Sequence, residues 1–425
     1  MQGRPFAEVC GALHLGENFH HLADAPWYQD AVYPAFPEAE YRRRHEALRA
    51  AMREKGLDCL IVPGSMNNGS MGYGVVWLSG HLDARALAQY VVFPLEGEPT
   101  LFCSMAGAHI WATRRWCALK DVRAAGGGGF GKAMAARIME LGLANRAIGL
   151  CSANSEGRSN EYLPANYYLE LRELLPEARL EFVAEILHPL MNIKSEEEKG
   201  FVRKAGELCD RAIRAIAERA APGVTEYQLN ASATFAVRDA GGYIHLDILG
   251  STSMARPALP FGNPRPSGRK VQRGDVIVNE YGAGYFGYTA QIGAPICMGP
   301  PSDALKRMHE EVAVPVFGAV EKCLRPGGTV EEVQEAAQLI VRKGYTSRPT
   351  VIHGIDIVTC PPHVEMAHIR AKPADRVFKE GMVIMSEPNP ITPDGRLGCF
   401  LGRTCIITAT GCEWVTRLPL DLIVV

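Results

Sequence analysis

The alternation of apolar and polar positions in the first part of the chain predicts helices and strands in turn. Residues 38–56 place Leu48, Ala51 and Met52 on one face of a helix that ends at Gly56. The apolar runs beyond this helix are too short for most helices, which favours buried strands. The predicted strands cover residues 58–64, 74–80, 89–95, 99–104 and 146–152, and a further helix covers 131–143. Helices that alternate with strands are typical of an α/β domain.

The pattern changes near residue 190, where long helices and strongly alternating strands begin. Ser195 and Glu198 have the spacing of a capping box, and Thr329 with Glu332 repeats it ahead of a helix that we expect to stop at Gly344. The first of these helices has apolar residues at helical spacing, namely Phe201, Ala205, Leu208, Ala212 and Ile216. The predicted strands cover residues 275–281, 288–296, 382–388 and 404–410.

Long helices over an antiparallel sheet predict an α+β fold for this second part. A chain of 425 residues is also long for a single hydrophobic core. We therefore expect an N-terminal extension over residues 1–36, a smaller α/β domain over 37–190 and a second domain over 191–425.

Composition and charge limit the classes of partner. The chain is 47% hydrophobic and 22% charged with a formal net charge of -2, which argues against a surface for nucleic acid. Its apolar runs fall short of the roughly 20 residues that span a bilayer, and its start lacks the pattern of a signal peptide. The 12 cysteines are scattered without a C-x-x-C pair, which favours reduced thiols. We therefore expect a cytoplasmic protein that binds neither nucleic acid nor membranes.

Six stretches of the sequence occur together in one known family. They are "LRAAMREKGLDCLIV", "IKSEEEKGFVRKA", "GDVIVNEYGAGYFGY", "HGI", "KEGMVIMSEP" and "GCEWVT". In these stretches and their order, the chain after residue 36 resembles the creatinase / aminopeptidase P / prolidase superfamily. The resemblance implies a C-terminal catalytic domain of the pita-bread fold, preceded by a smaller α/β domain of creatinase type.

Peptidases of that family hold two divalent ions with two Asp, one His and two Glu. At these five positions the resemblance places Glu280, Gln291, His353, Glu387 and Gly402. Two carboxylates would leave about two of the four positive charges of the ions uncompensated, which is costly in a buried site. We therefore expect no cofactor. The alternative is one divalent ion held by Glu280, His353 and Glu387.

The same three residues are the predicted catalytic groups. Glu280 shares a strand face with the apolar Val276 and Val278, and Glu387 follows an apolar run, so both carboxyls are expected to be buried. Two neighbouring carboxyls push one pKa upward and allow acid and base roles to be divided. His353 would act as acid, base or anchor, with Asp356 as a candidate to orient it.

The predicted substrate-binding residues surround these groups in the sequence. Asn263 stands where the family has a Pro-His pair, Tyr hydroxyls can donate to a substrate oxygen, and Arg265, Arg269 or Arg403 can hold a carboxylate. Cys360 takes the place of a second family His and is expected to pack inertly. The full substrate-binding set is Asn263, Tyr285, Tyr288, Gln291, His363, His368 and Arg403.

Creatinases are the precedent for this combination within the family, because they keep the His and the first Glu while they replace both Asp and the last Glu. The resemblance therefore predicts a metal-independent, creatinase-type hydrolase, or a lyase, that cleaves a C–N bond in a small non-peptide substrate. Creatinase relatives form homodimers, which implies a homodimer here. Two alternatives stay open: a single-metal Xaa-Pro peptidase-like or lyase enzyme, and a catalytically inactive member that acts as a binding protein.

Overall fold

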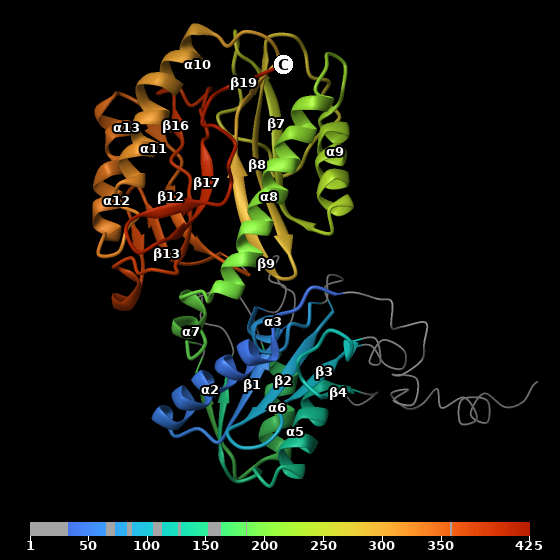
Figure 1. Cartoon of the computed structure of the whole chain (residues 1–425). Coiled ribbons are helices and arrows are strands. Elements are labelled where there is room, and N and C mark those ends of the chain that lie inside the picture. Colours follow the sequence, from blue (N-terminus) through green and yellow to red (C-terminus); the bar gives the residue numbers. More distant parts are fainter. Residues whose placement is uncertain are drawn as a thin grey trace, which may run out of the picture. The chain divides into compact units, whose positions relative to one another are not determined.

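The computed structural model describes residues 33–64, 73–82, 87–104, 113–125, 129–151, 163–183, 185–357 and 359–425. Most of the predicted N-terminal extension, residues 1–32, lies outside the described residues. The chain divides into two compact units, Met1–Met191 and Asn192–Val425 (Figure 1). No helix in the described part of the chain combines the length and the apolar character that a bilayer crossing requires.

The first unit is built on a mixed sheet. Its six described strands have the order β4-β3-β2-β1-β5-β6. The central strand β1 pairs antiparallel with β2 and parallel with β5. The strands are β1 (Cys59–Pro63), β2 (Gln89–Pro94), β3 (Thr100–Cys103), β4 (Asp121–Ala124), β5 (Ala147–Leu150) and β6 (Arg179–Phe182). The helices described around them are α2 (Glu38–Lys55), α3 (Tyr73–Ser79), α5 (Phe130–Glu140), α6 (Ala165–Leu174) and α7 (His188–Asn192).

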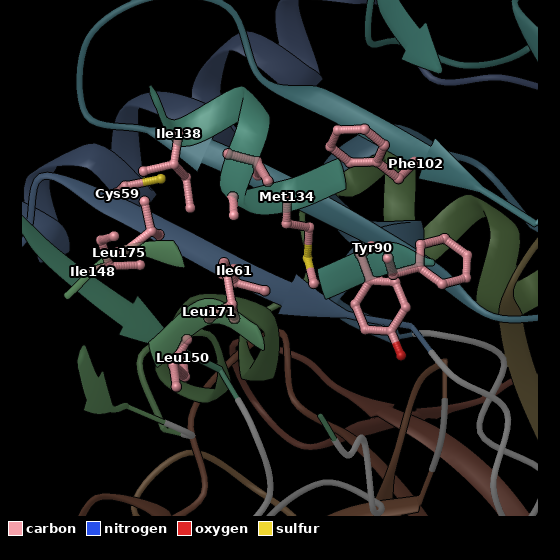
Figure 2. Close-up of a cluster of buried hydrophobic side chains, with 13 residues drawn as sticks. Cys59, Ile61, Tyr90, Phe102, Met134, Ile138, Ile148, Leu150, Leu171 and Leu175 are labelled. Atoms are coloured by element: carbon pink, nitrogen blue, oxygen red, sulfur yellow. The ribbon is translucent and has the colours of Figure 1, made fainter. Parts of the chain in front are cut away.

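Helices α5 and α6 bury their apolar faces on one side of this sheet. Figure 2 shows Met134 and Ile138 of α5 and Leu171 of α6 beside side chains of the strands. Each fully buried side chain of this kind stabilises the fold by about 1.5–3 kcal/mol. Helix α2 ends as predicted, because Gly56 takes a left-handed conformation with φ of 65° and its N–H bonds back to the helix.

The strand predicted over residues 74–80 is wrong, because this segment is helix α3. All seven residues of α3 are buried, so the run shows none of the periodicity that separates a helix from a strand. Contacts within the helix and from α2 stabilise the helical form. Ser79 Oγ donates to the Val75 carbonyl at 2.6 Å, and Arg44 Nη1 donates to the Trp77 carbonyl at 2.8 Å. These bonds satisfy carbonyls near a helix end.

The second unit contains a large, mostly antiparallel sheet. Its described strands have the order β14-β13-β12-β15-β17-β9-β8-β10-β19, with β18 on β17 and β7 on β8, and β11 pairs with β16 separately. The strands are β7 (Tyr243–Ser253), β8 (Asp275–Tyr285), β9 (Tyr288–Gly293), β10 (Ile296–Cys297), β11 (Thr346–Ser347), β12 (Thr350–Ile355), β13 (Thr359–Glu365), β14 (Ile369–Arg370), β15 (Val383–Ser386), β16 (Pro390–Ile391), β17 (Gly402–Ile407), β18 (Cys412–Trp414) and β19 (Ile423–Val424).

Capping boxes start three helices of this unit. The two predicted boxes are confirmed: Ser195 with Glu198 starts α8, and Thr329 with Glu332 starts α12. The sequence reasoning missed a third box ahead of α9. The helical segments are α8 (Glu196–Arg219), α9 (Glu226–Asp239), α10 (Asp303–Met308), the π-helical turn His309–Ala313, α11 (Val314–Glu321), α12 (Val330–Ala337), α13 (Leu339–Arg342) and the 3-10 turn Pro373–Asp375. The α+β class predicted from these patterns is confirmed.

Helix α8 packs against β8 and β9, the strands that carry Glu280 and Gln291. It packs along β8 and β9 (Figure 1), and Cys209 Sγ donates to the Ala290 carbonyl at 3.1 Å. The tight turn from β8 to β9 has positive φ at Phe286 and Gly287, as hairpin turns that match strand twist require. This turn fixes the register in which Gly282 faces Gln291.

Candidate active site

Neighbouring parts of the second sheet bring the three predicted catalytic residues together. Glu280 lies on β8, His353 on β12, and Glu387 directly after β15. His353 Nε2 lies 3.7 Å from Glu387 Oε1, and the carboxyls of Glu280 and Glu387 share a hydrogen bond. All three side chains are buried. The backbone N–H of Glu387 donates to the Val351 carbonyl at 2.8 Å, which fixes the end of β15 against β12.

Arg348 is a fourth residue of the candidate site, and it brings a positive charge that the sequence reasoning missed. It lies between β11 and β12, with Nη1 at 3.5 Å from Glu280 Oε2 and 3.7 Å from Glu387 Oε2. Its guanidinium carbon lies 3.8 Å from the ring centroid of Phe261 and 5.5 Å from that of Phe400. No motif identifies Arg348. The only signal was indirect, because two buried carboxyls need a nearby positive charge.

Burial and hydrogen bonding divide the roles of the two carboxyls. Burial raises the pKa of Glu280, and the neighbouring Glu387 charge raises it further. Burial also raises the pKa of Glu387, whereas Arg348 and the hydrogen bond with Glu280 lower it. Glu280 therefore holds the proton of the pair more tightly, and Glu387 is the partner that ionises first. A carboxylic acid beside a carboxylate can supply one proton and accept another.

Two further histidines lie close to His353. The His363 ring is tilted against the His353 ring with centroids 5.7 Å apart, and burial lowers the pKa of His363 to about 3. Burial and the nearby His353 lower the pKa of His245, on β7, to about 4. Burial also lowers the pKa of His353. All three imidazoles are therefore neutral near pH 7, and His245 is a neighbour that sequence reasoning did not find.

Several buried polar atoms around the carboxyl pair have no hydrogen-bond partner within the described residues. They are Gln291 Oε1, Arg348 Nη1, Glu387 Oε2, and both side-chain atoms Oδ1 and Nδ2 of Asn389. Buried polar atoms are normally paired, and each unpaired one costs free energy. Asn389 follows Glu387 by two residues and directly precedes β16. Strand β16 pairs with β11, and Arg348 directly follows β11. This concentration of unpaired donors and acceptors is typical of a site that binds a polar ligand.

The residues present do not fit the two-ion centre that the resemblance implies. Gln291 and Gly402 replace two carboxylate ligands, and a Cβ atom at Gly402 would lie 2.6 Å from Met385 Cε and 3.1 Å from Phe400 Cε1. The space of the last ligand is thus filled by apolar side chains. Among the described residues, no group of three or more His, Cys, Asp or Glu could hold a metal ion. The Arg348 guanidinium also places a positive charge against both remaining carboxyls.

The packing at Gly402 leads to a stability prediction. Gly402→Ala should lower the free energy of unfolding by about 1–3 kcal/mol, because its Cβ would lie 3.0 Å from the Gly293 backbone nitrogen and 3.1 Å from the Phe400 ring, whereas the Met385 methyl can move away. The matched control is Gly200→Ala, in α8, where a Cβ meets nothing within 4 Å and should stabilise the helix. Urea unfolding of both variants measures the difference. A Gly402→Ala variant as stable as the natural protein would show that this space is open.

The structure gives several predicted substrate-binding residues other tasks. Arg403 is buried, and its guanidinium donates to the carbonyls of Gly293, Gly402, Leu418 and Pro419. Its donors are used to hold backbone, which corrects the prediction that Arg403 holds a substrate carboxylate. Arg269 is likewise used, because it donates to Asp275 Oδ2 at 2.7 Å.

The two tyrosines serve the contact between α8 and the hairpin. Tyr288 Oη donates to Glu198 Oε1 at 2.7 Å, and the Tyr285 ring packs edge-on against Phe201. Their assignment to substrate binding stays a prediction. His368 is exposed between β13 and β14, away from the buried carboxyl pair.

The remaining predicted residues lie on or beside the strands that carry Glu280 and His353. Gln291 on β9 faces Gly282, two residues beyond Glu280, and His363 lies against His353. The Asn263 backbone carbonyl accepts a hydrogen bond from the Leu249 N–H at 3.0 Å. Asn263 therefore lies beside β7, the neighbour of β8. Asp356 does not orient His353, because its carboxylate pairs with Lys194 Nζ at 2.9 Å. Cys360 is buried on β13 opposite Gly354.

Two family descriptions match the chain. Residues 200–409 match the metallopeptidase family M24, and residues 44–190 match the creatinase/prolidase N-terminal domain. The matches follow one another and lie on the two units in turn.

An Xaa-Pro dipeptidase and a probable dipeptidase are among the similar proteins. The chain is 28% identical over 265 residues to the Xaa-Pro dipeptidase of Pyrococcus horikoshii, which covers 61% of this chain and 73% of that protein. It is 25% identical over 400 residues to the probable dipeptidase PepE of Mycobacterium bovis, which covers 92% of this chain and 98% of that protein.

Solved structures share the fold. The prolidase from Pyrococcus horikoshii has a TM-score of 0.71 at 23% identity and covers 90% of this chain and 100% of its own. The Xaa-Pro dipeptidase from Bacillus anthracis has a TM-score of 0.73 at 21% identity and covers 91% of this chain and 100% of its own. At these identities the likeness shows the fold.

These findings correct two predictions. Creatinase-type cleavage of a small non-peptide substrate is wrong, because the named relatives are dipeptidases, which act on peptide bonds. The prediction that no cofactor is needed is contradicted by the match to a metallopeptidase family, although the residues around Glu280 do not fit two ions. The prediction of a hydrolase is supported by the same relatives.

The resemblance seen in the sequence is thus confirmed in both halves of the chain and in its fold. A metallopeptidase domain behind a creatinase/prolidase N-terminal domain shows that the chain belongs to the creatinase / aminopeptidase P / prolidase superfamily, whose catalytic domain has the pita-bread fold.

Proposed function

We propose that the protein is a peptidase that hydrolyses the peptide bond of short peptides of the Xaa-Pro dipeptide class. Similarity to dipeptidases over 61% and 92% of the chain supports this substrate class. The observation that carries the proposal is the buried Glu280–Glu387 carboxyl pair beside His353. A carboxyl pair of this kind supplies both proton transfers that amide hydrolysis needs.

The proposed proton transfers follow from the hydrogen bond between the two carboxyls. Glu387, the ionised partner, takes a proton from a water molecule as the water oxygen bonds to the peptide carbonyl carbon. Glu280, the protonated partner, gives its proton to the leaving amine nitrogen as the C–N bond breaks. Glu387 then returns a proton to Glu280 through their hydrogen bond, which restores the starting state. Neutral His353 lies beside that carboxylate, with Nε2 3.7 Å from Glu387 Oε1, and its ring is fixed by a contact of 2.9 Å between Nδ1 and the Gly354 carbonyl.

The surroundings of the pair complete the proposal. Gln291, Asn263 and His363 are proposed to contact the substrate, and Gln291 offers an unpaired buried oxygen for an N–H group. We further propose that an N-terminal extension over residues 1–36 is followed by two domains, over residues 37–190 and 191–425. We propose a cytoplasmic protein that acts on a small substrate and binds neither nucleic acid nor membranes, and the net charge of -2 supports the absence of a nucleic-acid partner. We also propose a homodimer, which the resemblance to dimeric creatinases supports.

The test of the proposed function is hydrolysis by the purified full chain. Dipeptides with proline or alanine in the second position are incubated with the protein, and released amino acids are quantified. We expect turnover of at least one Xaa-Pro dipeptide and none of creatine, the non-peptide control. Absence of turnover for every peptide offered, by a protein with a cooperative unfolding transition, would refute the proposal.

Metal content is a separate prediction. Fewer than two ions per chain should copurify with the protein, because Gln291 and Gly402 remove two of the five ligands and Arg348 lies against the other carboxyls. Elemental analysis of protein purified without chelator measures this number. Two tightly bound ions per chain would contradict the conclusion drawn from the packing at Gly402.

A further inference from the structure

Arg348 points an unused hydrogen-bond donor at the carboxyl pair. Its Nη1 atom is buried and has no hydrogen-bond partner within the described residues. The distances to Glu280 Oε2 and Glu387 Oε2 are 3.5 and 3.7 Å, which is within ion-pair range and beyond a normal hydrogen bond. Glu387 Oε2 is itself a buried acceptor without a partner. A charged donor and an acceptor thus lie side by side with no hydrogen bond between them, and each can bind a substrate atom.

The guanidinium is held in place by its apolar contacts. Phe261 lies under it at 3.8 Å and Phe400 at 5.5 Å, and the Arg348 side chain is 25% exposed. Stacking on aromatic faces fixes the plane of the guanidinium without using its N–H groups. The same Phe400 ring fills the space beside Gly293 and Gly402. The ring that occupies this space thus also contacts the Arg348 guanidinium.

We propose that Arg348 is a catalytic residue that binds the oxyanion formed on the peptide carbonyl. This inference rests on the proposed peptidase function. When the water oxygen bonds to the carbonyl carbon, the electron pair of the C=O double bond moves to the carbonyl oxygen, which becomes negative. Arg348 Nη1 then donates to that oxygen, and its fixed charge balances the new one. Collapse of the intermediate returns the pair to the double bond as the amine leaves with the proton of Glu280.

Charge and position favour this role over binding of a substrate carboxylate. Arg348 Nη1 lies 3.5 and 3.7 Å from the two buried carboxyls, so a substrate carboxylate there would be a third acidic group beside one guanidinium. The oxyanion is transient and forms only as Glu387 takes up a proton, so its negative charge appears when that of Glu387 disappears. A preorganised charged donor of this kind stabilises the transition state more than the bound substrate.

The test compares Arg348→Met and Arg348→Lys with the natural protein. Arg348→Met should lower kcat by about 10²- to 10³-fold with a small change in KM, as the loss of one oxyanion donor does. Arg348→Lys should recover part of the loss, because it keeps the charge. Guanidinium ion at millimolar concentration should partly rescue Arg348→Ala. The matched control is Arg342→Met, an exposed arginine paired with Glu335, which should keep full activity.

A binding measurement separates this role from others. A phosphinic dipeptide analogue, which resembles the tetrahedral intermediate, should bind Arg348→Met about 10²-fold more weakly by calorimetry. In the Glu280→Gln background, the dipeptide substrate should bind with and without Arg348 nearly equally. If the natural protein turns over dipeptides while Arg348→Met changes only KM, Arg348 holds the substrate and the oxyanion role is refuted. If the natural protein turns over no peptide, the proposed peptidase function is refuted, and the oxyanion role that rests on it is refuted with it.

Discussion

Glu387→Gln should lower kcat for dipeptide hydrolysis by about 10²- to 10⁴-fold, the range for loss of a general base. Glutamine has nearly the same shape, but its amide cannot take a proton from the attacking water. Glu387 is buried, and its neighbour Glu280 holds the proton of the pair more tightly. Glu280 therefore cannot replace Glu387 as the base. Release of proline from an Xaa-Pro dipeptide, followed at saturating substrate, measures the loss.

Glu280→Gln should reduce kcat by a similar factor, because it removes the acid that protonates the leaving nitrogen. The double variant should be little worse than the more severe single variant, since residues that act as a unit are not additive. Glu310→Gln, at an exposed glutamate of the second unit, is the control and should keep full activity. A Glu387→Gln variant that keeps more than half of kcat, with unchanged unfolding, would remove the carboxyl pair from the reaction.

The sequence predicted the strands of this site better than the charges within it. Alternating positions from Val276 to Glu280 required a buried strand face, and the family motif aligned Glu280 with His353 and Glu387. Neither the strand pattern nor the family motif pointed to Arg348. It stands alone between two short strands, and its contacts with Phe261 and Phe400 depend on segments far from it in the chain. Long-range packing of this kind leaves no local pattern.

The wrong function had a different physical cause. The loss of ligands at Gln291 and Gly402 was interpreted as a change of substrate class. Ligand identity determines how charge is balanced in the site, whereas the bond that is cleaved depends on what the pocket binds. Similarly, Arg403 was assigned to a substrate because it is charged. The carbonyls of Gly293 and Pro419 that hold it were invisible in the sequence.

The helix α3 error shows the same limit at the level of secondary structure. Val75 and Val76 favour strands by propensity, but the segment is buried on all sides and its carbonyls are met by Ser79 and Arg44. Tertiary contacts override propensity where every residue is buried. The capping boxes at Ser195 and Thr329, by contrast, act within one turn and were read correctly.

Lys194→Met should lower the free energy of unfolding by about 3–5 kcal/mol, the usual cost of breaking a buried ion pair. Lys194 Nζ lies 2.9 Å from Asp356 Oδ2, and the two side chains are 0% and 2% exposed. Lys194 also donates to the Asn192 carbonyl at 3.2 Å, and the Asp356 carbonyl accepts from Thr289. The pair thus joins the segment before α8 to the end of β12 and to β9, and methionine would remove the cation that lies 2.9 Å from this buried carboxylate.

The double variant Lys194→Met, Asp356→Asn tests whether this loss comes from the unpaired charge. Asparagine keeps an oxygen for the Ile357 N–H, which now donates to Asp356 Oδ1, while it removes the charge. Most of the stability should therefore return. Lys204→Met, at an exposed pair with Glu207, is the control and should change stability by less than about 1 kcal/mol. Urea unfolding measures all three, and a Lys194→Met variant no less stable than Lys204→Met would show that the buried pair contributes little to the free energy of unfolding.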